Sequence, residues 1–130
     1  MKDIIAYQGS RFTIEWYFDE RDRSPALEYY HQLSPERQRK TMRLFKLIAE
    51  VMLVYNEEKF RNEGDQIYAF KPQPDRFLCF FFDGAKIIVT NAFEKKSQKL
   101  PEAEKSRAMR YKNDYVARIN RGTYYDEEKK

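Results

Sequence analysis

The chain has few of the residues on which most enzyme chemistry depends. Its 130 residues include one histidine, His31, and one cysteine, Cys79. A single cysteine excludes an internal disulfide and a cysteine metal cluster, and a single histidine excludes a ribonuclease mechanism based on a histidine pair. The sequence has no GxGxxG loop, no phosphate-binding GxxxxGK loop and no HExxH motif. The common nucleotide-cofactor and zinc-hydrolase sites are therefore excluded, and we expect neither a cofactor nor a metal.

Long hydrophobic runs are also absent. No apolar stretch approaches the roughly 20 residues that cross a bilayer, and the apolar run near the N-terminus is too short for a secretory signal peptide. Charged residues make up 35% of the chain and aromatic residues 16%. We therefore expect a cytoplasmic protein with one domain at residues 1–122 and a frayed tail at 123–130.

Positive charge is concentrated in the second half of the chain. Residues 1–64 contain 11 Lys and Arg against 11 Asp and Glu, whereas residues 65–130 contain 14 against 10. The whole surplus of +4 thus lies after residue 64. Because phosphate groups are bound by clustered cations rather than by net charge, this distribution favours a nucleic acid or an acidic protein as partner.

Hydrophobic periodicity predicts the first elements of an α+β domain. Apolar residues alternate from 12 to 18, which predicts a strand with one buried face. Ser24-Pro25 and Ser34-Pro35 each place a capping hydroxyl before a proline, which predicts two successive helices. The second helix has an apolar stripe that we expect to face the core, formed by Leu44, Ile48, Val51, Met52 and Tyr55. A charged linker is expected at 56–65.

The second half is predicted to contain strands joined by short turns. These strands lie at 67–70, 76–82 and 85–90, and Asp83-Gly84 predicts a two-residue hairpin turn because glycine tolerates a positive φ. Pro101 predicts the start of a final helix. We therefore expect a small antiparallel sheet of about four strands, with an N-terminal helical hairpin packed on it and a C-terminal helix beside it.

Lysine and arginine residues gather near the predicted ends of these strands. In segment 86–101, KIIVTNAFEKKSQKLP, an apolar strand leads directly into Lys95 and Lys96. Fixed cations stabilise the charge that develops on a phosphodiester more in the transition state than in the ground state. The 2′-OH of RNA is an internal nucleophile, so cleavage needs only in-line geometry, removal of one proton and neutralisation of the leaving 5′-oxygen. The lysine, arginine and tyrosine residues that could bind the phosphodiester and transfer the proton are Lys71, Arg76, Lys86, Lys95, Lys96, Lys99, Arg107, Arg110 and Tyr111.

A lysine can act as the base in such a reaction. Neighbouring positive charge lowers the pKa of a lysine, and Lys95 and Lys96 are adjacent. On the residue pattern alone, the same lysines also fit a solvated loop that performs no chemistry. Only a more specific feature can distinguish a catalytic role of these lysines from a solvated loop.

That feature is a resemblance that covers most of the chain. The segments SPALEYYHQLSPERQRKTMRLFKLI, IYAFKPQPDRFLCFFFDGAKIIVTNAFEKKSQKLP and EAEKSRAMRYKNDY resemble the phage-related, HigB-like branch of the RelE/ParE toxin superfamily of type II toxin–antitoxin systems. The resemblance implies a compact RelE-like, microbial-RNase-like fold. It also implies a ribosome-dependent endoribonuclease that cuts mRNA in the A site, and a cognate antitoxin, expected to be a helix-turn-helix protein. The residues that carry the match are Arg76, Phe93, Lys95, Lys96, Gln98, Lys99 and Pro101.

The chain departs from the pattern of that branch at a few positions. Asn91-Ala92 stand where these toxins usually have His-Gly, Lys71 stands where an arginine is usual, and Ala69 replaces an acidic residue. Asn91 cannot exchange a proton near neutral pH, so we expect another group to act as acid or base, or cleavage to be slower. Lys71 keeps the positive charge but lacks the planar fork of arginine.

These considerations lead to a set of predicted site residues. Arg76 is predicted to hold the scissile phosphate, and Lys71, Lys95 and Lys96 to complete the catalytic set as a base or a backbone clamp. Tyr68 and Tyr111 are candidates for base stacking or proton donation, although Tyr111 also fits a core position. Phe93 is either a core anchor or a stacking platform. The predicted RNA-binding residues are Lys99, Arg107, Arg110, Tyr68, Phe93 and Tyr111.

Two other functions remain open on the sequence. One is a superfamily member without catalysis that inhibits a protein target such as DNA gyrase, as ParE-type toxins are thought to do. The other is a phage-encoded domain that binds RNA without chemistry. For the toxin, we expect the antitoxin to be acidic opposite Lys95, Lys96 and the face from Arg107 to Arg118, or to displace the C-terminal helix.

Overall fold

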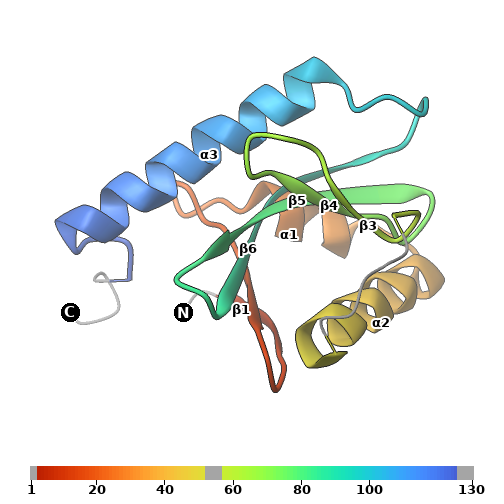
Figure 1. Cartoon of the computed structure of the whole chain (residues 1–130), viewed down its shortest axis with the longest axis horizontal. Coiled ribbons are helices and arrows are strands. Elements are labelled where there is room, and N and C mark those ends of the chain that lie inside the picture. The colour runs from red at the N-terminus through yellow and green to blue at the C-terminus, as the bar shows by residue number, and fades with distance from the viewer. Residues whose placement is uncertain (1–2, 52–56, 126–130) are drawn as a thin grey trace.

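The computed structural model describes residues 3–51 and 57–125. Three helices cover the two faces of one six-stranded sheet, with α1 and α2 on one face and α3 across the other (Figure 1). The strand order is β1-β2-β6-β5-β4-β3. In chain order the elements are β1 (Ile5–Gln8), β2 (Thr13–Trp16), α1 (Pro25–His31), α2 (Pro35–Val51), β3 (Phe60–Asn62), β4 (Tyr68–Phe70), β5 (Asp75–Phe82), β6 (Lys86–Glu94) and α3 (Glu102–Arg121).

The α+β class is confirmed, but the predicted four-stranded antiparallel sheet is wrong. The sheet has six strands and is mixed, because β2 pairs in parallel with β6 while the other neighbours are antiparallel. The two additional strands, β1 and β3, are four and three residues long. Such short segments are ordered by backbone pairing with a neighbour, and β3 lies within the charged stretch that had been expected to be a linker.

The predicted starts of the two N-terminal helices are confirmed. The hydroxyl oxygen of Ser24 accepts a hydrogen bond from the Leu27 N–H at 3.4 Å, and that of Ser34 accepts one from the Arg37 N–H at 3.3 Å. The stripe predicted for α2 is confirmed only in part. Leu44 and Ile48 are buried, whereas Val51 is 43% exposed, because it lies on the flank of α2 beyond the arc that faces the sheet. Met52 and Tyr55 lie outside the described residues.

The central strand β5 is covered on both faces, as its apolar sequence predicted. Phe77 and Cys79 contribute to the core under α1 and α2, while Leu78 and Phe80 contribute to the core under α3. The predicted hairpin between β5 and β6 is present, with a longer loop than expected. Phe82 pairs with Lys86, which leaves the three residues 83–85 in the turn, and both Asp83 and Gly84 have positive φ, 58° and 72°.

The chain remains ordered past the end of α3. Pro101 is the residue before the helix rather than its first residue, and Gly122 ends the helix with a φ of 75°. Tyr124 is 3% exposed, and its hydroxyl accepts a hydrogen bond from the Phe18 N–H at 2.9 Å. The hydroxyl of Tyr125 donates to Glu15 at 2.6 Å. The expected frayed tail is therefore wrong for residues 124 and 125, and residues 126–130 lie outside the described part.

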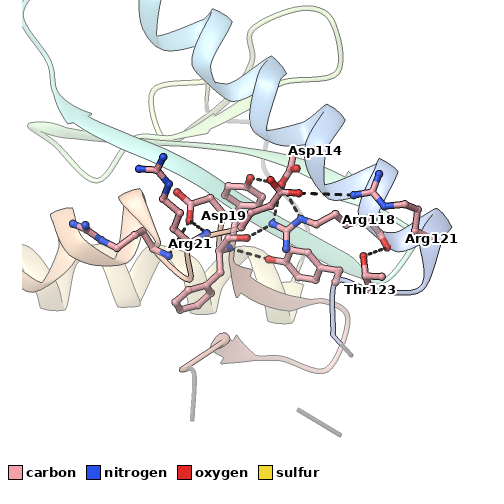
Figure 2. Close-up of polar contacts among 11 residues, drawn as sticks. Asp19, Arg21, Asp114, Arg118, Arg121 and Thr123 are labelled. Carbon is pink, nitrogen blue, oxygen red and sulfur yellow. Dashed lines mark hydrogen bonds and ion pairs between the residues drawn. The ribbon is translucent and has the colours of Figure 1, made fainter. Parts of the chain in front are cut away.

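A buried polar network connects α3 to the segment after β2 (Figure 2). Arg118 donates from Nε to Asp114 at 3.0 Å and from Nη2 to the carbonyl of Phe18 at 2.5 Å. Asp114 also accepts a hydrogen bond from Tyr17. No buried side-chain nitrogen or oxygen among the described residues lacks a hydrogen-bond partner, and these contacts anchor the C-terminal half of α3 to the sheet. Within residues 3–51 and 57–125, no helix is long and apolar enough to cross a membrane.

Candidate functional site

A groove of about 520 Å³ lies on the α3 face of the sheet, between the first half of α3 and the adjoining ends of β4, β5 and β6. We call it the cationic groove because six of its lining residues are Lys or Arg and three are acidic. The cations are Arg61, Lys71, Arg76, Lys95, Lys99 and Lys105, and the acids are Glu63, Asp65 and Glu102. Its apolar lining is Ala69, Phe93, Leu100 and Met109.

Sheet topology brings three distant cations to one edge of the groove. Because β4, β5 and β6 are antiparallel neighbours, the end of β4, the start of β5 and the end of β6 lie side by side. Arg76 pairs with Phe93, Lys71 follows the last residue of β4, and the Lys95 N–H donates to the carbonyl of Pro74 at 2.8 Å. Of the predicted catalytic set Arg76, Lys71, Lys95 and Lys96, the structure therefore brings the first three together.

Arg76 is an almost buried guanidinium, with 8% of its surface exposed. Its Nη1 donates to Gln73 Oε1 at 3.3 Å and to the carbonyl of Asp75 at 3.1 Å. Burial lowers the pKa of Arg76 from its usual value, although an arginine remains charged. No ion pair involves Arg76 among the residues that the structure describes. A buried cation without a carboxylate partner is well suited to hold an external anion.

The surroundings of Lys71 lower the pKa of its ammonium group. Burial lowers the pKa of Lys71, and the positive charge of Arg76 lowers it further. Arg61 and Lys95 act in the same direction, while Glu63 opposes them. The ammonium group donates to the carbonyl of Glu57 at 3.0 Å. These neighbours favour the neutral amine of Lys71 relative to an exposed lysine.

The segment after β6 divides its lysines between the groove and solvent. Lys95 and Lys99 line the groove with Phe93, whereas Lys96 is exposed and does not line it. Lys96 therefore does not lie with Arg76, Lys71 and Lys95, the other residues of the predicted catalytic set.

Tyr68 lies on the opposite face of the sheet from the groove. Its ring stacks on Phe60 with centroids 5.5 Å apart and meets the edge of Phe81 at 5.0 Å. These rings pack against the core under α1 and α2. Ala69, its neighbour on β4, lines the groove instead. Because side chains alternate between the two faces of a strand, Tyr68 lies away from the groove and is not placed for the predicted base stacking or proton donation there.

The aromatic and basic residues predicted on α3 are also not brought to the groove. Tyr111 stacks on Tyr17 with centroids 4.9 Å apart, which is the core position considered for it. Arg107 pairs with Glu104 at 2.8 Å, and Arg110 is exposed with its guanidinium 5.4 Å from the Tyr111 ring centre. Arg118 is buried and paired with Asp114, so it does not contribute to an exposed cationic surface with Arg107 and Arg110.

Two cations of the groove were not predicted from the sequence. Arg61 lies on β3, within the expected linker, and no local signal indicated that it would join the sheet. Lys105 lies in the first turn of α3 and forms an ion pair with Asp65 at 3.0 Å. The helical spacing of Lys105 and Met109 was the signal that would have placed both on one side of α3.

Asn91, where the resembling toxins usually have histidine, has a structural role. It is 2% exposed, and its Nδ2 donates to the backbone carbonyl of Glu104 at 3.2 Å and to its carboxylate at 3.0 Å. Its Oδ1 accepts from the Thr90 hydroxyl at 2.7 Å. Asn91 thus joins β6 to the first turns of α3 and does not line the groove.

Comparison with known families assigns the chain to a protein family. A family model described as "Phage derived protein Gp49-like (DUF891)" matches residues 28–113. The chain belongs to this family. The Gp49-like family is part of the RelE/ParE-like toxin superfamily, and the matched residues include every residue that lines the cationic groove. None of the curated proteins compared with the chain matches it.

The groove provides cations and few metal ligands. Among residues 3–51 and 57–125, no group of three or more His, Cys, Asp and Glu side chains is placed to hold a metal ion. The chemistry that these side chains offer is anion binding by Arg76, with proton transfer at Lys71.

Proposed function

We propose that this Gp49-like protein is the toxin of a type II toxin–antitoxin system, of the HigB-like kind, and acts as a ribosome-dependent endoribonuclease in the cytoplasm. The observation that carries the proposal is the buried Arg76 guanidinium. It has no ion-pair partner among the described residues and adjoins two lysines at the cationic groove. A phosphodiester supplies the negative charge that this arrangement lacks.

Cleavage in this groove follows from the chemistry of RNA. Arg76 binds the scissile phosphate, and the neutral amine of Lys71 removes the proton of the 2′-OH. The 2′-oxygen then bonds to phosphorus while the bond from phosphorus to the 5′-oxygen breaks. Lys95, as an ammonium, donates a proton to the leaving 5′-oxygen, while the proton of the 2′-OH is held by Lys71. The products are a 2′,3′-cyclic phosphate and a 5′-OH, and no oxidant or cofactor is consumed.

The rest of the groove offers binding contacts for the flanking nucleotides. Lys99 and Lys105 extend the positive charge beyond the predicted catalytic residues, and Phe93 is a half-buried ring at the end of β6. A cation tracks phosphates, and an aromatic face accepts any base by stacking. Such contacts hold the scissile nucleotide in the in-line geometry that the reaction needs.

The proposal is tested by primer extension on mRNA from cells that express the protein. Cuts in register with the reading frame, confined to translated regions, are expected of a ribosome-dependent nuclease. The variant Arg76→Ala is expected to remove the cuts. Arg39→Ala, an exposed arginine on the opposite face of the sheet, is the matched control and is expected to retain them. Cuts outside translated regions would contradict ribosome dependence.

A second candidate is a toxin that acts by binding a protein target, as in the ParE-like kind. The buried position of Asn91 favours it, because the groove has no histidine to donate a proton. In that case growth arrest would occur without any mRNA cuts, and Arg76→Ala would leave the arrest unchanged. The same expression experiment therefore separates the two functions.

A further inference from the structure

A second groove follows α2 on the face of the sheet opposite the cationic groove. Its volume is about 650 Å³, within the range of clefts that bind ligands or peptide segments. Leu47 and Val51 lie in it, and they are 44% and 43% exposed. We call it the α2 groove. Its lining residues are Leu44, Leu47, Val51 and Pro72, together with Lys40, Arg43, Lys46, Glu50 and Lys59.

The polar rim of the α2 groove is strongly positive. It has four cations and one carboxylate, that of Glu50. Glu50 is already engaged, since it accepts a hydrogen bond from the Tyr7 hydroxyl at 2.8 Å. The four cations, Lys40, Arg43, Lys46 and Lys59, form no ion pair with any residue in the described part of the chain. The rim therefore presents four exposed cations that have no ion-pair partner among the described residues, around an aliphatic floor.

We propose that the α2 groove binds an acidic amphipathic helix of a partner protein. An amphipathic helix places aliphatic side chains every three or four residues, and these fill a groove such as that around Leu47 and Val51. Acidic residues on the flanks of the same helix then face the cations on the rim. Charge complementarity of this kind speeds association and excludes partners of the wrong sign.

Other occupants fit the α2 groove less well. A second copy of this chain in a symmetric dimer would place the same patch against itself, with cations opposite cations. A nucleic acid would satisfy the cations, but the described residues that line the groove include no aromatic ring on which a base could stack. The combination of an aliphatic floor and a positive rim therefore selects an acidic helix.

The proposal does not depend on RNA cleavage. The α2 groove and the cationic groove share no lining residue and lie on opposite faces of the sheet. A partner bound at α2 leaves Arg76 and Lys71 accessible. The test therefore measures binding alone, and its failure would leave the proposed nuclease activity unaffected.

The experiment uses a fluorescent peptide of about 17 residues, the length of α2. The peptide has leucines at positions i, i+4, i+7 and i+11, with glutamates on both flanks, and is titrated with the full-length protein by anisotropy. Saturable binding that weakens with salt is expected. Hydrogen exchange of the complex is expected to show protection at α2 rather than at α3.

Variants test the two parts of the surface separately. The double change Leu47→Asp and Val51→Asp is expected to weaken binding by about 10-fold or more, because both apolar anchors are lost. The double change Lys40→Glu and Lys46→Glu is expected to slow association and flatten its salt dependence. Arg39→Glu makes the same charge change on the same helix, outside the groove, and is the matched control. Circular dichroism melting shows whether each variant folds.

Several results would overturn the proposal. These are binding that is absent up to about 1 mM peptide, equal binding of a peptide with the same composition but scattered leucines, and protection confined to the cationic groove. A concentration-dependent dimer that the Leu47→Asp change abolishes would assign the surface to self-association instead. If the double aspartate variant does not fold, the single change Leu47→Asp provides the same comparison.

Discussion

At the scale of single residues, the cationic groove depends on how Arg76 and Lys71 affect one another. Arg76 forms no ion pair among the described residues, although the carboxylates of Glu63 and Asp75 act on it at longer range, so its charge also acts on Lys71 and on any bound anion. The pKa of Lys71 is lowered by burial and by that charge. One arginine thus serves two purposes in the proposed reaction, because it binds the phosphate and favours the neutral form of the base.

The first prediction concerns Arg76. Arg76→Ala is expected to lower single-turnover cleavage on programmed ribosomes by about 100-fold or more, the scale of one lost transition-state contact. Arg76→Lys is expected to restore only part of the rate, because an ammonium lacks the planar fork of a guanidinium. Equal rates for the folded alanine variant and the wild type would remove Arg76 from the mechanism.

The second prediction concerns the pH dependence of cleavage. A general base acts when it is neutral, so the rate is expected to rise with pH through the pKa of Lys71 and then to level off. Since the charge of Arg76 lowers this pKa, Arg76→Ala raises it. The rising limb of the pH–rate profile is therefore expected to move to higher pH in that variant. A limb that stays in place while the rate falls would show that another group is the base.

At the scale of elements, an ion pair between the buried Asp75 and the partly exposed Arg37 holds α2 against the strand that presents Arg76. Asp75 is 1% exposed at the start of β5. It accepts a hydrogen bond from Tyr29 of α1, and Arg37 of α2 donates to it from Nε at 3.0 Å and from Nη2 at 2.5 Å. Strand alternation then directs Asp75 toward the helices and Arg76 toward the groove. The helical hairpin thereby fixes the position of Arg76.

The third prediction follows from this contact. Arg37→Ala leaves the carboxylate of Asp75 buried without its cation, which is expected to lower the free energy of unfolding measurably. The double variant Arg37→Ala with Asp75→Asn is expected to regain part of that loss, because the charge is removed as well. Urea unfolding at pH 7 measures both, with Arg39→Ala as the control. A loss below about 0.5 kcal/mol would show that the pair contributes little.

At the scale of the whole molecule, the sheet separates two surfaces of different character. The α3 face has the cationic groove, where Arg76 is buried and Lys71 half-buried. The face with α1 and α2 has an exposed aliphatic groove with a positive rim. A substrate and a partner protein therefore need not compete for one surface.

The fourth prediction concerns metal ions and products. The proposed reaction uses the 2′-OH, Lys71 and fixed cations, so cleavage by the purified protein is expected to continue in EDTA on ribosomes kept intact by polyamines. The products are expected to have a 2′,3′-cyclic phosphate or 3′-phosphate and a 5′-OH, detected by end-group analysis. Loss of cleavage in EDTA, or products with a 5′-phosphate, would contradict this chemistry.

The sequence by itself determined the features that depend on local interactions. The Ser-Pro pairs marked the starts of α1 and α2, because capping and proline geometry involve residues that are adjacent in the chain. The apolar run of β5 showed that both of its faces are covered, and Asp83-Gly84 marked the hairpin. The convergence of Arg76, Lys71 and Lys95 was also predictable, because it follows from antiparallel neighbours joined by short turns.

Only the tertiary structure decided the features that depend on distant partners. The parallel pairing of β2 with β6 joins residues about 70 positions apart, and the short strands β1 and β3 are ordered by such pairing. Lys95 enters the groove while Lys96 faces solvent, and Tyr68 packs on the far face. Asn91 became a link to α3 because Glu104 lies beside it. Each outcome depends on which surface another element covers, and the residues next to it in the chain do not determine that.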